Sequence, residues 1–527
     1  MIDAPGLRSF AESIPLLSMI VFAPIVGVLA ILLVPGGNHR AIRWIALIAA
    51  LASLAFSLLL LTYNTNAISD LGGPGPSSEF QFREDYSWIP AFGMGYRMGV
   101  DGLSLVLVIL TTVLSVVAIL YSWDPIRTRV KEYYATMLLL MVGMLGVFVS
   151  LDLFLFYVFW ELSLIPMYLM IGIWGGPRRI YATVKFVIYT LVGSLLMLVA
   201  ILAVAIAHAA AGNEFTFAYE QLRGFPFSDG LQALAFIAFF LAFAIKVPMW
   251  PLHTWLPDAH VEAPTAGSII LAGVLLKLGG YGFLRFSLPL LPDAAAEFAP
   301  IVIGLAVIAI LYGALVSMVQ PDLKKLIAYS SVSHMGFVML GTFVFNQQGL
   351  QGAVFQMISH GVTTGALFLL VGVIYERTHD RLIAHMGGLN AKLPRYAAMF
   401  GLFTFASIGL PGLSGFVGEF LVVLGAFKFN GWVAGATMLV VIFSSVYMLW
   451  MFQRVFFTVP SGWIRRFWPS LSDMSRTEWL ALAPLLFLVV ALGVFPGPVL
   501  HLTQAPVDHI IQAVSGSNGL ASLGLPW

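Results

Sequence analysis

Apolar runs of about 20 residues recur along nearly the whole chain, and they limit what it can fold into. A helix of that length, at about 1.5 Å per residue, spans the roughly 30 Å hydrocarbon core of a bilayer. Hydrophobic residues make up 60% of the 527 residues and charged residues only 10%. Soluble domains carry about 25% charged residues. The sequence therefore predicts an all-α polytopic membrane protein.

About fourteen such runs are predicted to cross the membrane. They are Ile14–Val34, Ala41–Tyr63, Leu103–Ser122, Tyr134–Ser150, Leu153–Trp174, Ile180–His208, the run from Leu231 that breaks at Pro248, Ala266–Leu288, Pro300–Met318, Leu323–Phe345, Gly349–Tyr375, Arg395–Phe427 with a break at Pro411, Trp432–Phe457 and Trp479–Leu500. The loop 64–101 contains FQFREDYSW, whose aromatic and charged alternation favours a short hairpin. The tail after Leu500 is expected to be a loop with little structure.

An internal repeat is indicated by two proline breaks, at Pro248 in the seventh predicted helix and Pro411 in the twelfth. Helices 4–8 and 9–13 would form two five-helix repeats, and because five is odd the second would be inverted. Inverted repeats with broken helices at matching positions mark the ion path of transporters. The alternative is a chance likeness between apolar helices. The expected units are 1–133, 134–288, 289–457 and 458–527.

The basic residues indicate the orientation, because lysine and arginine favour cytoplasmic loops. We number the loops between predicted helices from the first helix onward. The odd-numbered loops hold about 17 of the 26 basic residues, and the opposite side holds about six. Three lysines, Lys185, Lys246 and Lys277, lie inside helices. We therefore expect a multi-pass protein of the bacterial inner membrane with both termini in the periplasm.

Ionisable residues inside the predicted helices form the candidate functional site. A charge at the bilayer centre costs roughly 2.5–3.5 kcal/mol on insertion scales, so such residues face the protein interior, pair with one another and mark proton relays. A Glu–Lys pair can switch a lysine between its charged and neutral forms without a cofactor. The candidates are Glu161, Lys185, Lys246, Lys277, His334, His360 and Glu419, with His253, Asp258 and His260 in the polar segment after Pro248.

Structural interpretations of these residues stay open. The buried Glu and Lys side chains would then form ion pairs that only hold helices together, and Lys185 would snorkel to a helix end. Residues 258–262 would cap the helix that begins near Pro264, and Asp101 would be an N-cap. Lys324 and its neighbour stand at a predicted inner helix start, where positive charge is ordinary.

The histidines leave a second class of function open. His334 and His360 would be hydrogen-bonding helix contacts, or several histidines would ligate haem b in pairs. No two of them stand at helix-matched depths in a four-histidine pattern. The chain has no cysteine, which excludes iron–sulfur clusters, thiolate metal sites and disulfides within it. It also has no Walker loop or dinucleotide-binding glycine fingerprint, and its net charge of +1 gives no indication of nucleic acid binding.

Five segments give the chain a recognisable family pattern. They are Phe159–Gly176, Lys246–Ser268, Leu275–Arg285, Asp322–Phe337 and Gly409–Phe420. With these segments the chain resembles the antiporter-like membrane subunits of respiratory complex I, the proton-pumping NADH:quinone oxidoreductase. Within that family it is most similar to the M-type branch, because Glu419 stands where paralogues usually have lysine and because the chain ends soon after the last predicted helix.

The resemblance implies a proton-translocating subunit, driven by quinone reduction in partner subunits. It implies that Glu161 and Lys246 form a Glu–Lys pair, that Lys277 is the central lysine, that His334 bridges the half-channels and that Glu419 is the outlet acid. Further relay candidates are Lys185, His253, Asp258, His260 and His360. NADH, FMN, iron–sulfur clusters and quinone are expected in partner subunits, among them neighbouring antiporter-like subunits. A subunit of a multisubunit sodium/proton antiporter or of a membrane-bound hydrogenase is the alternative.

Overall fold

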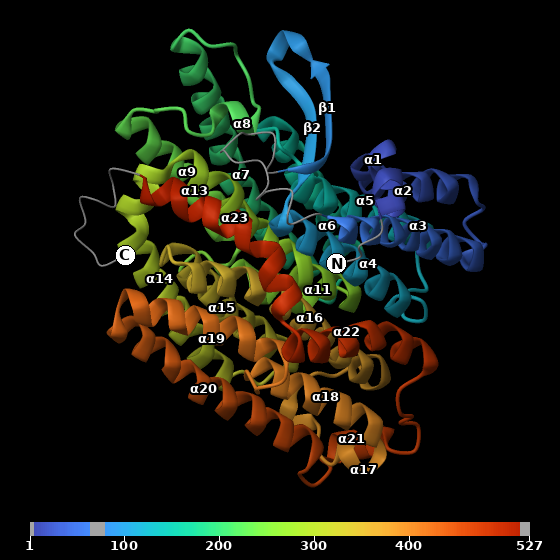
Figure 1. Cartoon of the computed structure of the whole chain (residues 1–527). Helices are drawn as coiled ribbons and strands as arrows, with labels where there is room; N and C mark the ends of the chain where they lie inside the picture. The colour runs from blue at the N-terminus through green and yellow to red at the C-terminus, as the bar shows by residue number, and fades with distance from the viewer. Residues whose placement is uncertain (1–4, 64–79, 517–527) are drawn as a thin grey trace.

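Long helices form nearly the whole of the computed structural model, which describes residues 5–63 and 80–516 (Figure 1). Within these residues thirteen helical runs are long and apolar enough to cross a membrane. Together with the broken pair α18–α19 they confirm the fourteen predicted helices. The runs are α2 (Leu16–Leu33), α3 (His39–Leu59) with η1 (Leu60–Thr62), α4 (Gly102–Tyr121), α5 (Val130–Val149), α6 (Leu153–Trp174), α7 (Arg179–Ala210), α9 (Asp229–Lys246), α11–α13 (Thr265–Leu290), α14 (Pro292–Met318), α15 (Leu323–Phe343), α16 (Gln347–Thr378), α20 (Gly431–Phe456) and α22 (Arg476–Val494).

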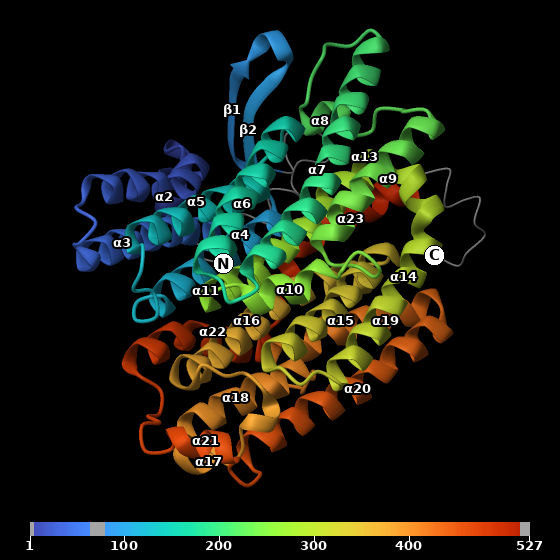
Figure 2. The same cartoon turned by 180° about the vertical axis from the view of Figure 1, so that it is seen from behind.

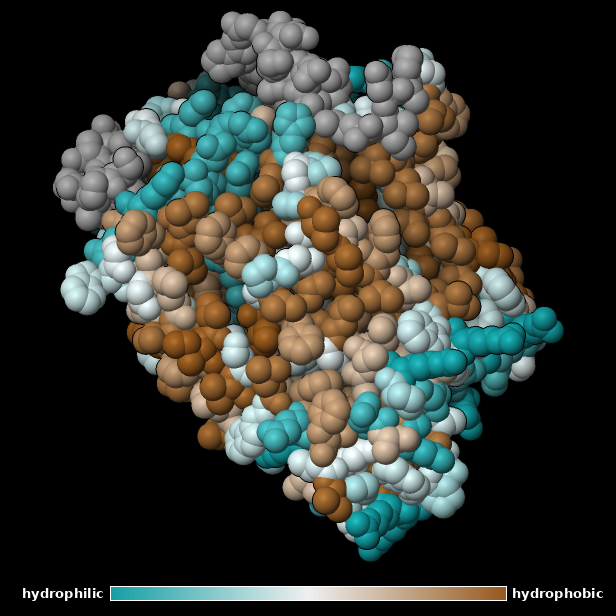
Figure 3. Space-filling model, turned by 60° about the horizontal axis from the view of Figure 1, so that its bottom comes forward, coloured by the Kyte–Doolittle hydropathy of each residue, from teal (hydrophilic) through white to brown (hydrophobic). Residues whose placement is uncertain are grey.

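The surface agrees with a membrane location. Figure 3 shows a broad hydrophobic area between hydrophilic patches at opposite edges of the molecule. Exposed Leu, Ile, Val and Phe side chains are numerous on α2, α7 and α20. Because contiguous apolar surface of this extent is rare on soluble monomers, it is surface for lipid or for neighbouring membrane subunits.

Both predicted helix breaks are confirmed. The helix α9 ends just before Pro248, and α10 (Trp255–Glu262) follows after an irregular turn. The second break separates α18 (Pro394–Ser407) from α19 (Ser414–Phe429). There the backbone needs glycine, because Gly409 and Gly412 on either side of Pro411 have φ angles of 77° and 91°.

The packing of the helices supports the inverted repeat. In the first set α5 packs against α6 and α7 packs against α9. In the second set α14 packs against α15 and α16 packs against α19, so equivalent helices are neighbours. The break falls in the fourth helix of each set. The residue boundaries proposed for the units stay a prediction.

Burial increases sharply from the outer helices to the central ones. Less than half of the most apolar stretch of α2, α3, α7, α14, α20 and α22 is buried. The corresponding stretches of α11–α13 and α16 are 100% buried and that of α15 is 94% buried. In both views α15 and α16 lie between the N-terminal helices and α18–α20 (Figures 1 and 2). The ionisable residues on these central helices are therefore shielded from lipid.

A β-hairpin follows α3, as the aromatic and charged alternation predicts. Its strands β1 (Gln81–Ile89) and β2 (Met94–Val100) are antiparallel and joined by η3 (Pro90–Phe92). The hairpin stands at the top of Figure 1, level with the end of α7. Residues 64–79 of the predicted loop lie outside the described residues.

The hairpin is tied to the helices by two buried carboxylates. Glu84 on β1 accepts hydrogen bonds from the backbone N–H groups of Leu17 (2.8 Å) and Ser18 (3.1 Å) at the start of α2. Asp152, which caps α6, forms an ion pair of 2.7 Å with Arg97 on β2. Burial raises the pKa of Asp152, although Arg97 and backbone N–H groups oppose the shift.

The expectation of an unstructured tail after Leu500 is wrong. The helix α23 (Gly497–Ser515) packs against α4, α13 and α16. Its apolar side chains recur at helical spacing and are buried, as Leu502, Pro506, Ile510 and Val514 show. Residues 517–527 lie outside the described residues. The other short helices are α1 (Pro5–Ser13), α8 (Tyr219–Leu222), η6 (Ile383–His385), α17 (Leu389–Lys392) and α21 (Gly462–Phe467).

Candidate functional site

Four buried ionisable side chains from four helices form a continuous series, here called the central chain. Lys277 Nζ on α12 (Leu276–Gly282) donates a 2.7 Å hydrogen bond to His360 Nδ1 on α16. The imidazole rings of His360 and His334 are 5.8 Å apart between centroids. His334 Nδ1 on α15 donates a 2.7 Å hydrogen bond to Glu419 Oε1 on α19. All four side chains are at least nine-tenths buried.

The backbone around Lys277 is shaped to place its amine. A π-helical turn, η4 (Leu271–Leu275), precedes α12, and the carbonyl of Ala272 in that turn accepts a hydrogen bond from Lys277 Nζ. Turns of this kind are frequent at functional sites. Gly361 lets α16 approach closely, since a Cβ there would lie 2.8 Å from the carbonyl oxygen of Gly273. The close approach brings His360 within hydrogen-bond distance of Lys277.

The far end of the central chain lies next to the second helix break. The Gln356 side-chain amide donates a 3.1 Å hydrogen bond to Glu419 Oε1, which also accepts from His334. Ser407, the last residue of α18, lies 3.4 Å from His334 Nε2. The break thus supplies Ser407 as a polar neighbour of His334, and α16 supplies Gln356 as a polar neighbour of Glu419.

A small cavity joins the two histidines. It has a volume of about 10 Å³ and is lined by His334, His360, Thr363 and Glu419, among others. This is close to the smallest volume that holds one water molecule. Within the described residues, His360 Nε2 and Thr363 Oγ1 have no hydrogen-bond partner, so a water there would be bonded.

The expected Glu161–Lys246 pair is not in direct contact. The amine of Lys246 lies over the rings of Trp160 and Phe186, at 5.4 and 5.8 Å from their centroids. In the described part of the chain no ion pair joins Lys246 to Glu161, and Glu161 Oε1 has no hydrogen-bond partner. Because consecutive residues point about 100° apart around a helix, Trp160 faces Lys246 and Glu161 points aside. Glu161 is close enough for its charge to act on Lys246. Their function as a unit stays a prediction.

Other relay candidates of the first repeat lie around α10. Lys185 forms a 2.7 Å ion pair with Asp258, which joins α7 to α10, so its charge does not simply snorkel away. The ring of His253 packs on Tyr312, and the ring of His260 stacks on Phe368. Among the described residues, the ring nitrogens of both histidines have no hydrogen-bond partner.

The capping interpretation of residues 258–262 is wrong, whereas that of Asp101 is confirmed. The helix α11 (Thr265–Ile270) has Pro264 at its N-cap and no side-chain cap. Glu262 instead accepts a 2.8 Å hydrogen bond from the backbone N–H of Arg178. Asp101 caps α4 by accepting from the N–H of Ser104, and it also forms a 2.5 Å ion pair with Arg285.

Sequence reasoning missed the burial of two cations. Arg285, in the π-helical turn η5 (Phe283–Ser287), and Lys324, at the start of α15, are each only 3% exposed. Lys324 Nζ donates a 2.9 Å hydrogen bond to the carbonyl of Ala263. A basic residue near the predicted end of a helix gives no signal that its side chain turns inward.

The two histidines considered as haem ligands, His334 and His360, lie together, and each uses its Nδ1 within the central chain. Within residues 5–63 and 80–516 no group of three His, Asp or Glu side chains is arranged to hold a metal ion.

A membrane-crossing bundle with an inverted repeat and a buried series of lysine, histidine and glutamate defines an ion-translocating membrane protein. The chain belongs to the NADH:quinone oxidoreductase/Mrp antiporter transmembrane family, whose model matches residues 150–448.

The chain is similar over nearly its whole length to named proteins of known complexes. The chain is 49% identical to the NADH-quinone oxidoreductase subunit M of Rhodobacter capsulatus, over 94% of this chain and 96% of the relative. It superposes on a chain of respiratory complex I from Thermus thermophilus with a TM-score of 0.82 and 34% identity, covering 94% of this chain and 99% of the other. A chain of the Mrp complex from Dietzia sp. DQ12-45-1b has a TM-score of 0.76 at 21% identity, covering 97% of this chain and 99% of the other, and shows the shared fold alone.

Proposed function

We propose that this chain is the proton-translocating membrane subunit of a complex I that reduces quinone with electrons from NADH. The central chain of Lys277, His360, His334 and Glu419 carries the proposal, since it is a hydrogen-bonded series of titratable groups in the most buried helices. The near-full-length similarity to relatives named as NADH-quinone oxidoreductase subunit M supports the choice of complex.

Each group of the central chain both takes up and releases a proton. The Lys277 ammonium gives a proton to His360 Nδ1 through their 2.7 Å hydrogen bond. A water in the small cavity carries the proton from the His360 ring to His334. His334 passes it to the Glu419 carboxylate through its own 2.7 Å hydrogen bond. Glu419 then releases its proton on the outlet side, both histidines return to their starting tautomers and Lys277 is reprotonated, so net transport needs no redox group in this chain.

The redox chemistry belongs to partner subunits in this account. NADH, FMN, iron–sulfur clusters and quinone bind there, and the partners include neighbouring antiporter-like subunits packed along the apolar outer helices. The chain would lie in the inner membrane of a bacterium, with the basic odd-numbered loops in the cytoplasm and both termini in the periplasm. A sodium/proton antiporter or hydrogenase complex is less well supported, because the similarity to the Mrp chain is only 21% identity.

Purification of the tagged chain in mild detergent tests the choice of complex. We expect flavin- and iron–sulfur-containing subunits to co-purify and the preparation to reduce a quinone with NADH. Recovery of hydrogenase subunits, or of antiporter subunits alone, from a preparation that retains this chain would contradict the proposal.

A further inference from the structure

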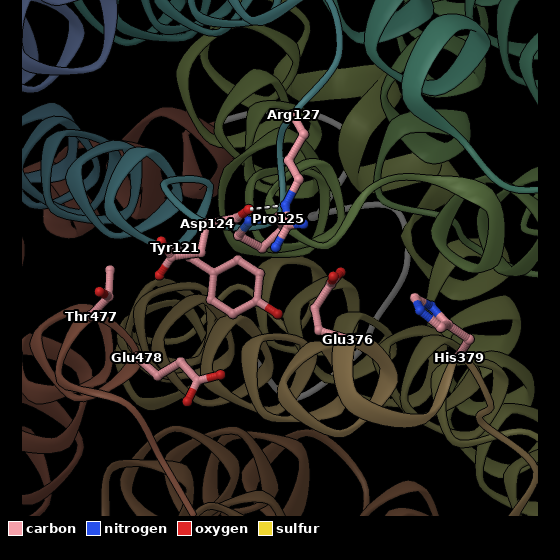
Figure 4. A pocket seen from close by; sticks show the side chains of 8 residues that line it. All are labelled: Tyr121, Asp124, Pro125, Arg127, Glu376, His379, Thr477 and Glu478. Carbon is pink, nitrogen blue, oxygen red and sulfur yellow. Dashed lines mark hydrogen bonds between the residues drawn. The ribbon is translucent and has the colours of Figure 1, made fainter. Parts of the chain in front are cut away.

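A polar cavity that shares no lining residue with the central chain opens among the basic loops (Figure 4). Its volume is about 360 Å³, and its lining comes from the end of α4 with the loop that follows it, the end of α16 and the start of α22. All three belong to the odd-numbered loops that carry most of the basic residues. Figure 4 shows Tyr121 and the carboxylates of Glu376 and Glu478 around one space. Glu376, Asp124 and Arg127 are exposed, so the cavity is open to solvent.

A second cavity of about 180 Å³ adjoins the first and is here called the inner cavity, because the buried Lys324 lines it. It shares Tyr121 and Glu376 with the outer cavity and is also lined by Thr265, Glu262 and Lys324. The path thus runs from an exposed carboxylate to a lysine that is only 3% exposed. Tyr121 and Thr265, two residues of this lining, pack closely against Gly372, because a Cβ there would lie 2.4 Å from the Tyr121 hydroxyl.

The amine of Lys324 is not used in a structural ion pair. The nearby carboxylate of Asp322 is occupied by Arg381, at 3.0 Å, and by the N–H groups that it caps at the start of α15. Within the described residues Lys324 forms no ion pair, although Glu262, Glu376, Asp322 and Arg381 all act on it by charge. A buried lysine held only by a carbonyl and a hydroxyl is costly to keep charged, so packing does not explain it.

Lys324 contacts the continuous helical run Thr265–Leu290, to which Lys277 itself belongs. Lys324 Nζ lies 3.5 Å from Ser268 Oγ. Ser268 precedes Ala272 by about one helical turn, roughly 6 Å along the axis, and the Ala272 carbonyl accepts from Lys277. His260, whose ring nitrogens lack partners among the described residues, is within electrostatic reach of both lysines. One turn of helix therefore separates the inner cavity from the central chain.

We propose that the two cavities are the proton inlet of this subunit and that Lys324 is its loading residue. This inference rests on the proposed function and specifies where protons enter the central chain. A neutral Lys324 amine takes a proton from water in the inner cavity and becomes an ammonium. The ammonium releases that proton, through Ser268 and bound water, to the neutral amine of Lys277, and Lys324 returns to its neutral form.

A blocking experiment tests the inlet in the assembled complex. The chain has no cysteine, so Thr477→Cys places a single thiol of this subunit in the outer cavity without touching the proposed relay. A membrane-impermeant sulfonated maleimide is added to inverted vesicles, in which the basic loops face the medium. We expect labelling to lower NADH-driven proton uptake by about tenfold. Arg129→Cys, exposed on the same side but outside both cavities, should be labelled without any loss of proton uptake.

Substitution of the lysine gives an independent measurement. Lys324→Met should lower proton uptake by about 100-fold, whereas Lys325→Met, at the half-buried neighbouring position outside both cavities, should not. The inlet is refuted by unchanged pumping after complete labelling of Thr477→Cys, by a thiol that the reagent cannot reach, or by normal pumping in Lys324→Met. Lys277→Met distinguishes the two levels of failure. If Lys277→Met also pumps normally, the proposed function itself is wrong. If Lys277→Met fails to pump while Lys324→Met pumps normally, only the proposed inlet is wrong.

Discussion

Replacement of the carboxylate at the far end of the central chain gives the most quantitative prediction. Glu419→Gln keeps the size of the side chain and an oxygen near His334 Nδ1, 2.7 Å away in the structure, but it removes the charge and the ability to take up a proton. The variant therefore separates the proton chemistry of this position from its packing.

The size of the effect follows from the hydrogen bond that is changed. A hydrogen bond to a charged group contributes about 1.5–3 kcal/mol and a neutral one about 0.5–1.5 kcal/mol. Protonated His334 would thus lose about 1–1.5 kcal/mol of stabilisation, which lowers its population by about tenfold. Since the terminal acceptor is also lost, proton uptake in Glu419→Gln should fall at least about tenfold. Glu419→Asp keeps the acid but shortens its reach by about 1.5 Å, and should retain part of the activity.

The assay is NADH-driven acidification of inverted vesicles, followed with a pH-sensitive dye and normalised to the amount of assembled complex. Glu132→Gln, at an exposed position on α5, is the matched control and should pump normally. Full pumping in Glu419→Gln, with assembly confirmed, would refute the assignment of Glu419 as a proton acceptor.

Three further predictions follow from the other contacts. Glu161→Gln and Lys246→Ala should each slow pumping, and the double variant should be hardly worse than either single one if they act as a unit; an additive double variant would show separate roles. Lys185→Met should lower pumping, since it breaks the 2.7 Å ion pair to Asp258, and recovery by adding Asp258→Asn would make the pair structural only. Gly361→Ala should separate α16 from η4 at a cost of about 1–3 kcal/mol and slow pumping while the complex still assembles; normal pumping would show that this close approach does not position Lys277.

Much of the fold could be predicted from the sequence, because a membrane restricts the helices by length and hydrophobicity alone. The breaks at Pro248 and Pro411 were also predicted, because proline lacks the backbone N–H and clashes with the preceding turn, although Pro24, Pro166 and Pro484 lie inside continuous helices. The helix α23 was missed, although its apolar residues repeat at helical spacing.

The residues of the candidate site could be predicted from the sequence, but their hydrogen-bond partners could not. A lysine or glutamate inside an apolar run can be identified from the sequence, as with Lys277 and Glu419. Its partner depends on side-chain direction and helix packing, so the bond from Lys277 to His360 and the separation of Glu161 from Lys246 were beyond the pattern. Burial of Lys324 depends on how α11 and α16 cover the start of α15, which no local pattern records.

The central claim is that protons cross this subunit through Lys277. Its most direct test is the rate of proton delivery by the purified complex in liposomes, compared between the unmodified protein, Lys277→Met and the control Lys325→Met. We expect Lys277→Met to lower the rate by about 100-fold, the low end of the contribution of a positioned proton-transfer group, while the control stays near the unmodified rate. A fully assembled Lys277→Met complex that delivers protons within about twofold of the unmodified rate, too small a loss for such a group, would contradict it.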